Sequence, residues 1–367
     1  MKGWLLIYLS VFAAGALSTL LLTPLFRMIA RKTGFMDEPA ANHKGHRKAT
    51  PLLGGAAIFC GWFACLVGGY LAVKFELSPS INSCIGEYVN GIYSTGRQLV
   101  AIVAAGALAV LLGLWDDKWA MAAQWKFLGQ FVVALVAVFL GGVRVNVFIA
   151  HPAITTAISI FWLMLLMNSI NFFDNMDGLA VGTIAIAMGF FTCFAALNRQ
   201  YFVAALAATT CGCSCGFWVY NAAPASIFMG DSGSHFLGYL AAVISARVTY
   251  FNTGSGQSQL AVLIPLFVLA LPLFDTAMVV IIRTLNKKPF WIGDHNHISH
   301  RFVRMGLSRP RAVLLVHMLA LCIGLGMLPV YWGKAQTAAV MVAQSLMILL
   351  IITVLQLALS EKPDARE

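Results

Sequence analysis

The chain has 367 residues, of which 60% are hydrophobic and only 10% are charged, well below the roughly 25% of charged residues in soluble domains. This composition excludes an ordinary soluble enzyme and indicates a membrane protein. The formal net charge of +10 fits positive loops that face an anionic leaflet and an anionic substrate, so no nucleic acid partner is needed to explain it.

Eleven apolar segments, each long enough to cross a bilayer, follow one another along the chain, and no strand alternation competes with them. We therefore expect an all-α fold, a polytopic helical bundle that forms a single membrane domain over residues 1–360 with a short cytoplasmic tail at 361–367. The N-terminal segment lacks a cleavage motif and should remain as the first helix. The expected spans are 3–26, 52–73, 98–115, 127–143, 154–171, 179–197, 202–219, 235–251, 259–282, 313–331 and 337–359.

Lys and Arg residues are distributed unevenly between the two sides of these spans. An N-terminus outside the cell places 17 of the 24 in inner loops and the C-terminal tail, and leaves 7 at the outer ends. Because Lys and Arg collect on the cytoplasmic side of membrane proteins, the sequence predicts an external N-terminus and a cytoplasmic C-terminus.

The inner loops contain an unusual number of acids and carboxamides. Two adjacent carboxylates, Asp116 and Asp117, follow the third span, with Lys126 ten residues after the first of them. Adjacent carboxylates repel each other beside an apolar helix end, and a nearby cation relieves that repulsion. A structural role alone would rarely select such a pair.

The stretch NSINFFDNMDGLA, residues 168–180, lies where the fifth span leaves the membrane. If the helical turn persists, its polar residues project to one side because they are spaced by three. The alternative is a solvated helix end with Gly178 as its C-cap. The polar residues are Asn168, Asn171, Asp174 and Asp177.

Two further inner loops carry candidates. Residues 221–234 contain Asn221 and Asp231, and the alternative there is an ordinary loop with Asp231 or Ser232 as the N-cap of the eighth span. The segment DHNHISHR, residues 294–301, gathers histidines and an arginine. Zinc is the competing interpretation of that segment, but it has neither cysteines nor a helical i,i+4 histidine pair.

These residue types together suit phosphate chemistry at a membrane surface. Carboxylates and a carboxamide suit Mg²⁺, which bridges phosphate oxygens. Lysine and arginine suit the rest of a pyrophosphate, and histidine can hold or transfer a proton. Phosphoryl transfer needs these parts and little covalent chemistry from the protein, so a lipid phosphate and a soluble phosphorylated partner are the expected substrates.

Six segments, in consistent order, resemble the polyprenyl-phosphate N-acetylhexosamine-1-phosphate transferases. This family includes the enzymes that start common-antigen, O-antigen and wall teichoic acid synthesis, and the phospho-N-acetylmuramoyl-pentapeptide transferase of peptidoglycan synthesis. Together the segments are specific, whereas each alone is weak. They are DEPAANHKGHRKATPLLGG (37–55), LGLWDDKWAMAAQWKFLGQ (112–130), NSINFFDNMDGLAVG (168–182), NAAPASIFMGDSGS (221–234), PLFDT (272–276) and DHNHISHR (294–301).

The resemblance implies transfer of an N-acetylhexosamine 1-phosphate, with N-acetylglucosamine favoured, from a UDP-sugar to undecaprenyl phosphate with release of UMP. It also implies a bacterial plasma membrane protein with a cytoplasmic active site, and it leaves a homodimer open. The implied cofactor is Mg²⁺, with Mn²⁺ as a substitute, on Asn171 and Asp231. The implied catalytic residues are Asp116, the base for the lipid phosphate, and Asp117, Asp174, Asp177, His297 and His300. The implied substrate-binding residues are Lys44, His46, Lys126, Asn168, Asn221, Ser299 and Arg301.

Two positions depart from the family pattern, and two alternatives remain. Ser299 replaces the middle histidine of the usual His-x-His-His, and Asn175 replaces the usual glycine, which leaves the exact sugar open. The peptidoglycan-branch enzyme has three consecutive histidines, so these departures argue against it. An ion-coupled transporter is the alternative from another class, because intramembrane acids often mark ion paths, and Asp275 is the one acid that fits it.

Overall fold

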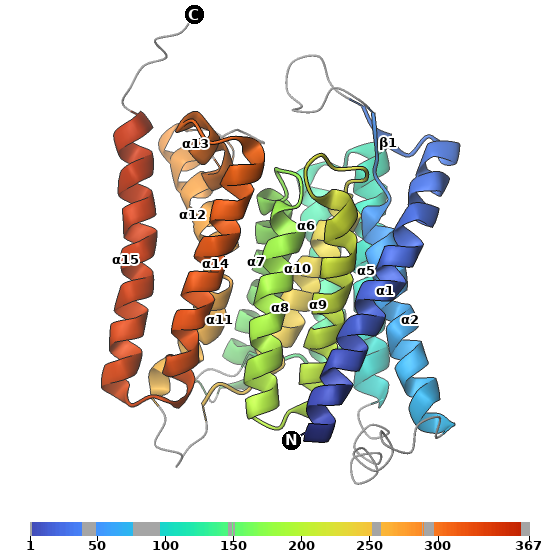
Figure 1. The fold of residues 1–367 in the computed structure, drawn as a ribbon, viewed down its shortest axis with the longest axis horizontal. Helices are drawn as coiled ribbons and strands as arrows, with labels where there is room; N and C mark the ends of the chain where they lie inside the picture. The colour runs from blue at the N-terminus through green and yellow to red at the C-terminus, as the bar shows by residue number, and fades with distance from the viewer. Residues whose placement is uncertain are drawn as a thin grey trace, which may run out of the picture.

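The structure of the chain is a computed structural model, which describes residues 2–38, 49–75, 96–145, 149, 151–251, 258–287, 289 and 297–360. Long helices lie side by side in these residues, and β1 (Met36–Asp37) pairs antiparallel with β2 (Thr50–Pro51). The beginning of the first helix and the end of the last lie at opposite ends of the bundle (Figure 1). The helices are α1 (Lys2–Thr33), α2 (Gly54–Lys74), α5 (Gly96–Trp119), α6 (Ala123–Leu135) with its π-helical continuation η2 (Val136–Leu140), α7 (Pro152–Phe173), α8 (Leu179–Leu197), α9 (Tyr201–Asn221), α10 (Gly230–Arg247), the 3₁₀ helix η3 (Gln259–Leu263), α11 (Ile264–Val268), α12 (Ala270–Leu285), α13 (Ile298–Arg304), α14 (Arg309–Trp332) and α15 (Ala335–Ser360).

The predicted class, an all-α multi-pass membrane bundle, is confirmed. In the described ranges nine helices are long and apolar enough to cross a membrane, and the bent pair formed by 259–268 and α12 makes ten. The predicted number of eleven stays a prediction, as does the division into one domain and a tail, because 361–367 lies outside the described residues. The ninth expected span is not straight, since its two parts meet at 72°.

The eighth expected span corresponds to α10, which lies in the middle of the bundle. It packs against α5 and α7, and also against α2 and α8. Every residue from Ser232 to Ala246 is buried, so this helix meets protein rather than lipid and needs no uniformly apolar surface. Its surroundings explain why α10 is not among the nine helices that pass on length and hydropathy.

Close backbone contact fixes the beginning of α10 against α5. A Cβ atom added at Gly113 of α5 would lie 2.3 Å from the backbone nitrogen and Cα of Ser232. Gly230 has φ +67, and a Cβ atom there would meet the carboxylate of Asp117. The two helices can therefore approach this closely only because both positions lack a side chain.

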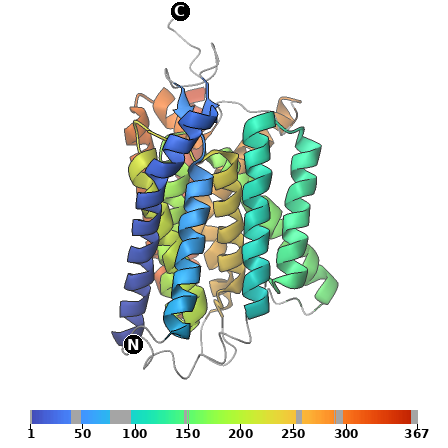
Figure 2. The same ribbon diagram turned by 90° about the vertical axis from the view of Figure 1, so that its right-hand side faces the viewer.

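The described helix ends that border the predicted inner loops all lie at one end of the bundle (Figures 1 and 2). They are the C-terminal ends of α1, α5, α7, α9 and α12 and the N-terminal ends of α2, α6, α8, α10 and α14. This end of the bundle, which we call the site end, holds the residues discussed below. Which side of the membrane it faces stays a prediction.

Three exposed tryptophans surround the turn between α5 and α6 at the site end. Trp115, Trp119 and Trp125 are 58%, 56% and 58% exposed. The rings of Trp115 and Trp119 lie 4.6 Å apart, and the Lys118 ammonium lies 4.5 Å from the Trp119 ring centroid. Tryptophan and lysine together at a helix end are typical of the membrane–water interface.

Candidate active site

A cavity of about 460 Å³ opens at the site end between α5, α6, α7, α12 and α13. Six of the polar candidates converge there. Other lining residues include Phe127, Phe172, Asn175 and Arg283. The sequence-predicted site residues that line it are Asp116, Lys126, Asn168, Asn171, Asp174 and His297.

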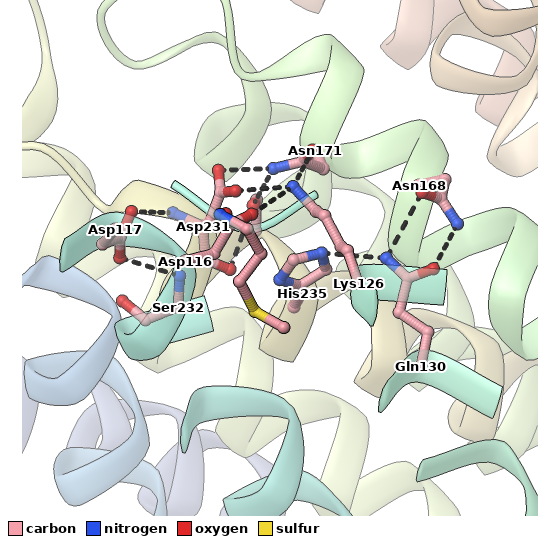
Figure 3. Close-up of polar contacts among 11 residues, drawn as sticks. Asp116, Asp117, Lys126, Gln130, Asn168, Asn171, Asp231, Ser232 and His235 are labelled. Atoms are coloured by element: carbon pink, nitrogen blue, oxygen red, sulfur yellow. Dashed lines mark hydrogen bonds and ion pairs between the residues drawn. The ribbon is translucent and has the colours of Figure 1, made fainter. Parts of the chain in front are cut away.

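The ammonium of Lys126, on α6, contacts side chains from α5, α7 and α10 (Figure 3). Its Nζ lies 2.8 Å from Asp116 Oδ2 and 2.6 Å from Asp231 Oδ2, and it donates to Asn171 Oδ1 at 3.2 Å. Asn171 Nδ2 in turn donates to Asp231 Oδ1 at 2.7 Å and to Ser234 Oγ at 2.9 Å. Lys126 is therefore the cation that relieves the repulsion between the carboxylates of Asp116 and Asp231.

The helices, and not the loops, carry this cluster. α5 runs four residues beyond the expected end of its span at 115, and α6 begins at Ala123, four residues before 127. Both extensions are possible because Asp116 and Lys126 satisfy each other, and because Asp116 Oδ1 also accepts from Met121 N at 2.7 Å. Side chains on rigid helices hold their geometry better than side chains on loops.

The two adjacent aspartates have separate environments. Asp116 faces the cavity, whereas Asp117 Oδ1 accepts from Asp231 N at 2.7 Å and Asp117 Oδ2 accepts from Ser232 N at 3.1 Å. Asp117 therefore caps the N-terminus of α10 from another helix, where a carboxylate is favoured. The alternative interpretation, in which Asp231 or Ser232 is the N-cap, is wrong, since both lie inside the first turn.

The helix that was expected to continue through Asp177 ends before it. α7 stops at Phe173, with Asp174 as the C-cap. Asp177 turns away, and its Oδ2 accepts from Ala225 N at 3.0 Å. Gly178, with φ +74, is the N-cap of α8 and not the C-cap of α7, so the alternative interpretation of this stretch is wrong on that point.

Asn221 supports these loops from the end of α9. Its Oδ1 accepts from Gly178 N at 3.1 Å, and its Nδ2 donates to Ile227 O at 3.0 Å. Asn221 does not line the cavity. Its contacts hold the segment before α8, which contains Asp174, against the segment that leads to Asp231 in α10.

Asp174 is the carboxyl whose surroundings oppose ionisation. Burial, followed by the charges of Asp231, Asp117 and Asp177, raises the pKa of Asp174 to about 8. A carboxyl of this kind favours a proton or an incoming cation. The surroundings of Asp174 therefore favour added positive charge, although Lys126 and Arg283 also line the cavity.

A polar network beneath the cavity was missed by sequence reasoning. Asn168 Nδ2 donates to Gln130 Oε1 at 2.6 Å and to Met164 O at 2.8 Å. Gln130 Nε2 lies 2.9 Å from His235 Nε2 (Figure 3). Both donor hydrogens of Asn168 are thus used within the protein, and Gln130 and His235 lay unnoticed inside apolar spans.

The histidine segment reaches the cavity through its first described residue. His297 precedes α13, and its Nδ1 lies 2.7 Å from Asp275 Oδ2. His300 has its ring centroid 6.3 Å from that of His297, and the buried Arg301 does not line the cavity. Ser299 is fully buried, and its Oγ donates to Asn175 Oδ1 at 2.5 Å.

Arg283 is a cavity residue that the sequence did not single out. It is 2% exposed, and its guanidinium carbon lies 5.4 Å from the Phe172 ring centroid. From the sequence it is only one of the basic residues near an inner loop. In the structure it lies on α12 eight residues after Asp275, which places both near one helix face. Two other predicted residues, Lys44 and His46, lie outside the described residues.

The oxygen atoms around Lys126 suit a hard cation. Two carboxylates and one carboxamide converge there, and their oxygens lie within 3.2 Å of Nζ. No group of three or more His, Cys, Asp or Glu side chains that could hold a metal occurs in the described ranges. Mg²⁺ accepts such a small set, because it keeps several waters and binds through one or two carboxylates plus phosphate oxygens.

Comparisons with known proteins match most of the chain. Residues 99–249 match the family described as glycosyl transferase family 4. The chain is 33% identical over 317 residues to the probable undecaprenyl-phosphate N-acetylglucosaminyl 1-phosphate transferase of Bacillus subtilis, covering 84% of this chain and 80% of that protein. It is 29% identical over 377 residues to the decaprenyl-phosphate N-acetylglucosaminephosphotransferase of Mycolicibacterium smegmatis, covering 96% and 89%. It is 28% identical over 315 residues to a phospho-N-acetylmuramoyl-pentapeptide-transferase of Bacillus mycoides, covering 80% and 88%.

Proposed function

Since the chain belongs to glycosyl transferase family 4 and is a phospho-sugar transferase, we propose that it transfers N-acetylglucosamine 1-phosphate from UDP-N-acetylglucosamine to undecaprenyl phosphate. UMP leaves, and the product is a polyprenyl-diphosphate-linked sugar that starts a cell-surface glycan. The names of the two N-acetylglucosamine-specific relatives support the choice of sugar. The single observation that carries the chemistry is the contact of Asp231 with Lys126 and Asn171, which line the cavity together with Asp116.

The reaction needs a positioned nucleophile and positive charge on the departing group. An oxygen of the acceptor phosphate attacks the sugar-bearing phosphorus, and the bond from that phosphorus to the oxygen of UMP breaks. Lys126 contacts the phosphates, and Asp116 takes the proton of an acceptor phosphate that arrives protonated. Asp231 and Asn171 would hold Mg²⁺, which neutralises the charge of the donor pyrophosphate when it is bound.

The contacts of Asp117 favour direct attack over a covalent aspartyl intermediate. Both of its carboxylate oxygens accept from backbone amides of α10 and it does not line the cavity. Asp116 lines the cavity, but it is held by Lys126 and by the amide of Met121. Charge neutralisation and positioning are sufficient for phosphoryl transfer without a covalent step.

The donor is a cytoplasmic nucleotide sugar, so we place the site end on the cytoplasmic face of a bacterial plasma membrane. The excess of Lys and Arg in the loops at this end supports the placement. The acceptor phosphate reaches the same end from the bilayer. A homodimer stays a prediction.

An assay of the purified protein tests this function. The protein is incubated with undecaprenyl phosphate, Mg²⁺ and a panel of UDP-sugars, and released UMP is measured. We expect turnover with UDP-N-acetylglucosamine. Turnover with UDP-N-acetylmuramoyl-pentapeptide alone would identify the other branch, to which one relative belongs, and no UMP with any donor would contradict the proposal.

The same assay tests the metal site. Asp231→Asn keeps the side-chain shape but removes the carboxylate that faces Lys126 and Asn171. We expect a loss in kcat of at least about 10²-fold, the scale for removing one strong electrostatic stabiliser, in a protein with an unchanged thermal midpoint. Activity near that of the wild type in the folded variant would remove Asp231 from the metal site.

A further inference from the structure

Asp275 of α12 is a buried acid that the proposed reaction does not use. It is 1% exposed, and each of its carboxylate oxygens has a hydrogen-bond partner. The partners are His297 and Ile298, which follow each other in the chain. Oδ2 lies 2.7 Å from His297 Nδ1, and Oδ1 accepts from Ile298 N at 2.6 Å. A buried carboxylate is stable only when it is paired and hydrogen-bonded in this way.

The first contact determines which nitrogen of His297 faces the cavity. A carboxylate oxygen only accepts, so the proton of the imidazole lies on Nδ1. Nε2 is then the nitrogen left for a ligand, and His297 lines the cavity that Asp174 and Arg283 also line. A histidine whose Nδ1 hydrogen binds a carboxylate has a fixed tautomer and a fixed ring orientation.

The second contact fixes the position of the backbone at the start of α13, next to His297. Ile298 is the first residue of α13, and its amide bond to Asp275 holds the backbone next to His297. The Asp275 side chain thus holds both the imidazole ring of His297 and the backbone beside it. An asparagine could not replace it, because its amide nitrogen would take the place of one carboxylate oxygen, and that nitrogen only donates.

We propose that Asp275 is a positioning residue that holds His297 with Nε2 directed at the phosphates of the donor. The inference rests on the proposed function, because the donor defines what Nε2 meets. Asp275 itself touches no substrate. It acts through His297 in the way that a carboxylate orients the histidine of a nucleophile–base pair.

Kinetics on a double-mutant cycle test the pairing. The variants are Asp275→Asn, His297→Ala and the double substitution, each assayed for UMP release and for thermal midpoint. We expect Asp275→Asn to lower kcat at least about 10-fold, since a wrong tautomer costs turnover, with little change in the KM for undecaprenyl phosphate. The double variant should match His297→Ala, because the first change acts only through the second residue.

Two further variants separate positioning from folding. Asp275→Glu keeps both acceptor oxygens and should recover part of the kcat, even if Asp275→Asn folds poorly. Thr276→Val is the matched control on the same helix, because the Thr276 hydroxyl is buried and has no hydrogen-bond partner among the described residues. It should behave like the wild type.

The outcomes distinguish this inference from the proposed function. A wild-type chain that releases no UMP with any donor overturns the function and the inference with it. Wild-type turnover together with a fully active Asp275→Asn overturns the inference alone. The same holds if the losses of the two single variants multiply in the double variant, because Asp275 would then act independently of His297.

Discussion

Asn175 and Ser299 meet beside the cavity in a fixed arrangement. Asn175 Nδ2 donates to Phe172 O at 3.1 Å, and a carbonyl can only accept, so the amide has one orientation. Ser299 Oγ must therefore donate to Asn175 Oδ1, at 2.5 Å. Asn175 lines the cavity whereas Ser299 is fully buried, so we expect any effect of Ser299 on a bound donor to pass through Asn175.

We expect Ser299→Ala to affect donor binding more than turnover. Loss of one hydrogen bond of about 1 kcal/mol should raise the KM for the UDP-sugar about 5-fold, or shift the preference between donors. His297→Ala and His300→Ala should instead lower kcat strongly. Steady-state kinetics decide this, with Ser308→Ala as the control, since that exposed serine makes no cap hydrogen bond. Lost turnover in Ser299→Ala with both histidine variants active would contradict it.

The raised pKa of Asp174 gives a prediction for stability. Its pKa is about 8 in the folded protein against a model-compound value of 3.8. Ionisation of this carboxyl costs nothing to folding below about pH 3.8, and the cost grows until about pH 8. Asp174→Asn should therefore have a higher thermal midpoint than the wild type at pH 8.5, and the difference should shrink as the pH falls towards 5.

Thermal unfolding in detergent with EDTA measures this difference without competing cations. A variant that is no more stable than the wild type at pH 8.5, or a difference independent of pH, would show that Asp174 ionises freely. In the wild-type chain, the ionised Asp174 lowers the free energy of unfolding, and the same carboxylate can bind an incoming cation.

The sequence identified the residues of the candidate site better than their contacts. Asp116, Lys126, Asn171 and Asp231 stood out because polar residues beside apolar spans are rare. The partners of Asp117 could not be predicted, since a cap from one helix to the backbone of another depends on how closely α5 and α10 approach. Arg283 and Gln130 were missed because only the packed bundle shows which face of their helices borders the site.

At the scale of the elements, the crossing of α5 and α10 is the contact on which the site depends. Gly113→Ala would put a Cβ atom 2.3 Å from backbone atoms of Ser232, and backbone cannot move aside as a side chain can. We expect a lower thermal midpoint and a lower kcat together, because the helices must separate and Asp117 then loses the amides of α10. Unfolding and UMP release measure the two effects.

Gly189→Ala on α8 is the matched control for that change. A Cβ atom at Gly189 meets nothing within 4 Å, so the variant should match or slightly exceed the wild type, as alanine favours a helix by about 0.5–1 kcal/mol. A Gly113→Ala protein as stable as this control would show that the two helices separate easily.

Hydropathy located the helices but not their directions or surroundings. It treated residues 259–282 as one straight span, whereas the chain bends by 72° around Leu269. It also began the eighth span at 235, whereas α10 begins at Gly230, because the polar first turn is stabilised by Asp117 and not by lipid. The contact from Asp117 explains the earlier start of α10, which the hydropathy of a single helix does not reveal.

At the scale of the whole molecule, single cysteines test the orientation. We expect Glu38→Cys and Met305→Cys, both near the site end, to react with a membrane-impermeant maleimide only after the cells are permeabilised. Lys334→Cys, between α14 and α15, should react in intact cells. The wild-type chain, with its own cysteines, gives the background. Labelling of position 38 or 305 from outside would reverse the predicted topology.

The exposed tryptophans at 115, 119 and 125 have a consequence for how the two substrates meet. If they lie at the level of the lipid headgroups, the neighbouring Asp116 and the cavity lie at that level too. Removing a polyprenyl tail from the bilayer would cost about 0.8 kcal/mol per CH₂ group, tens of kcal/mol for a long chain. A site at this depth avoids that cost: the acceptor arrives by diffusion in two dimensions and the donor by diffusion in three, and neither leaves its own phase.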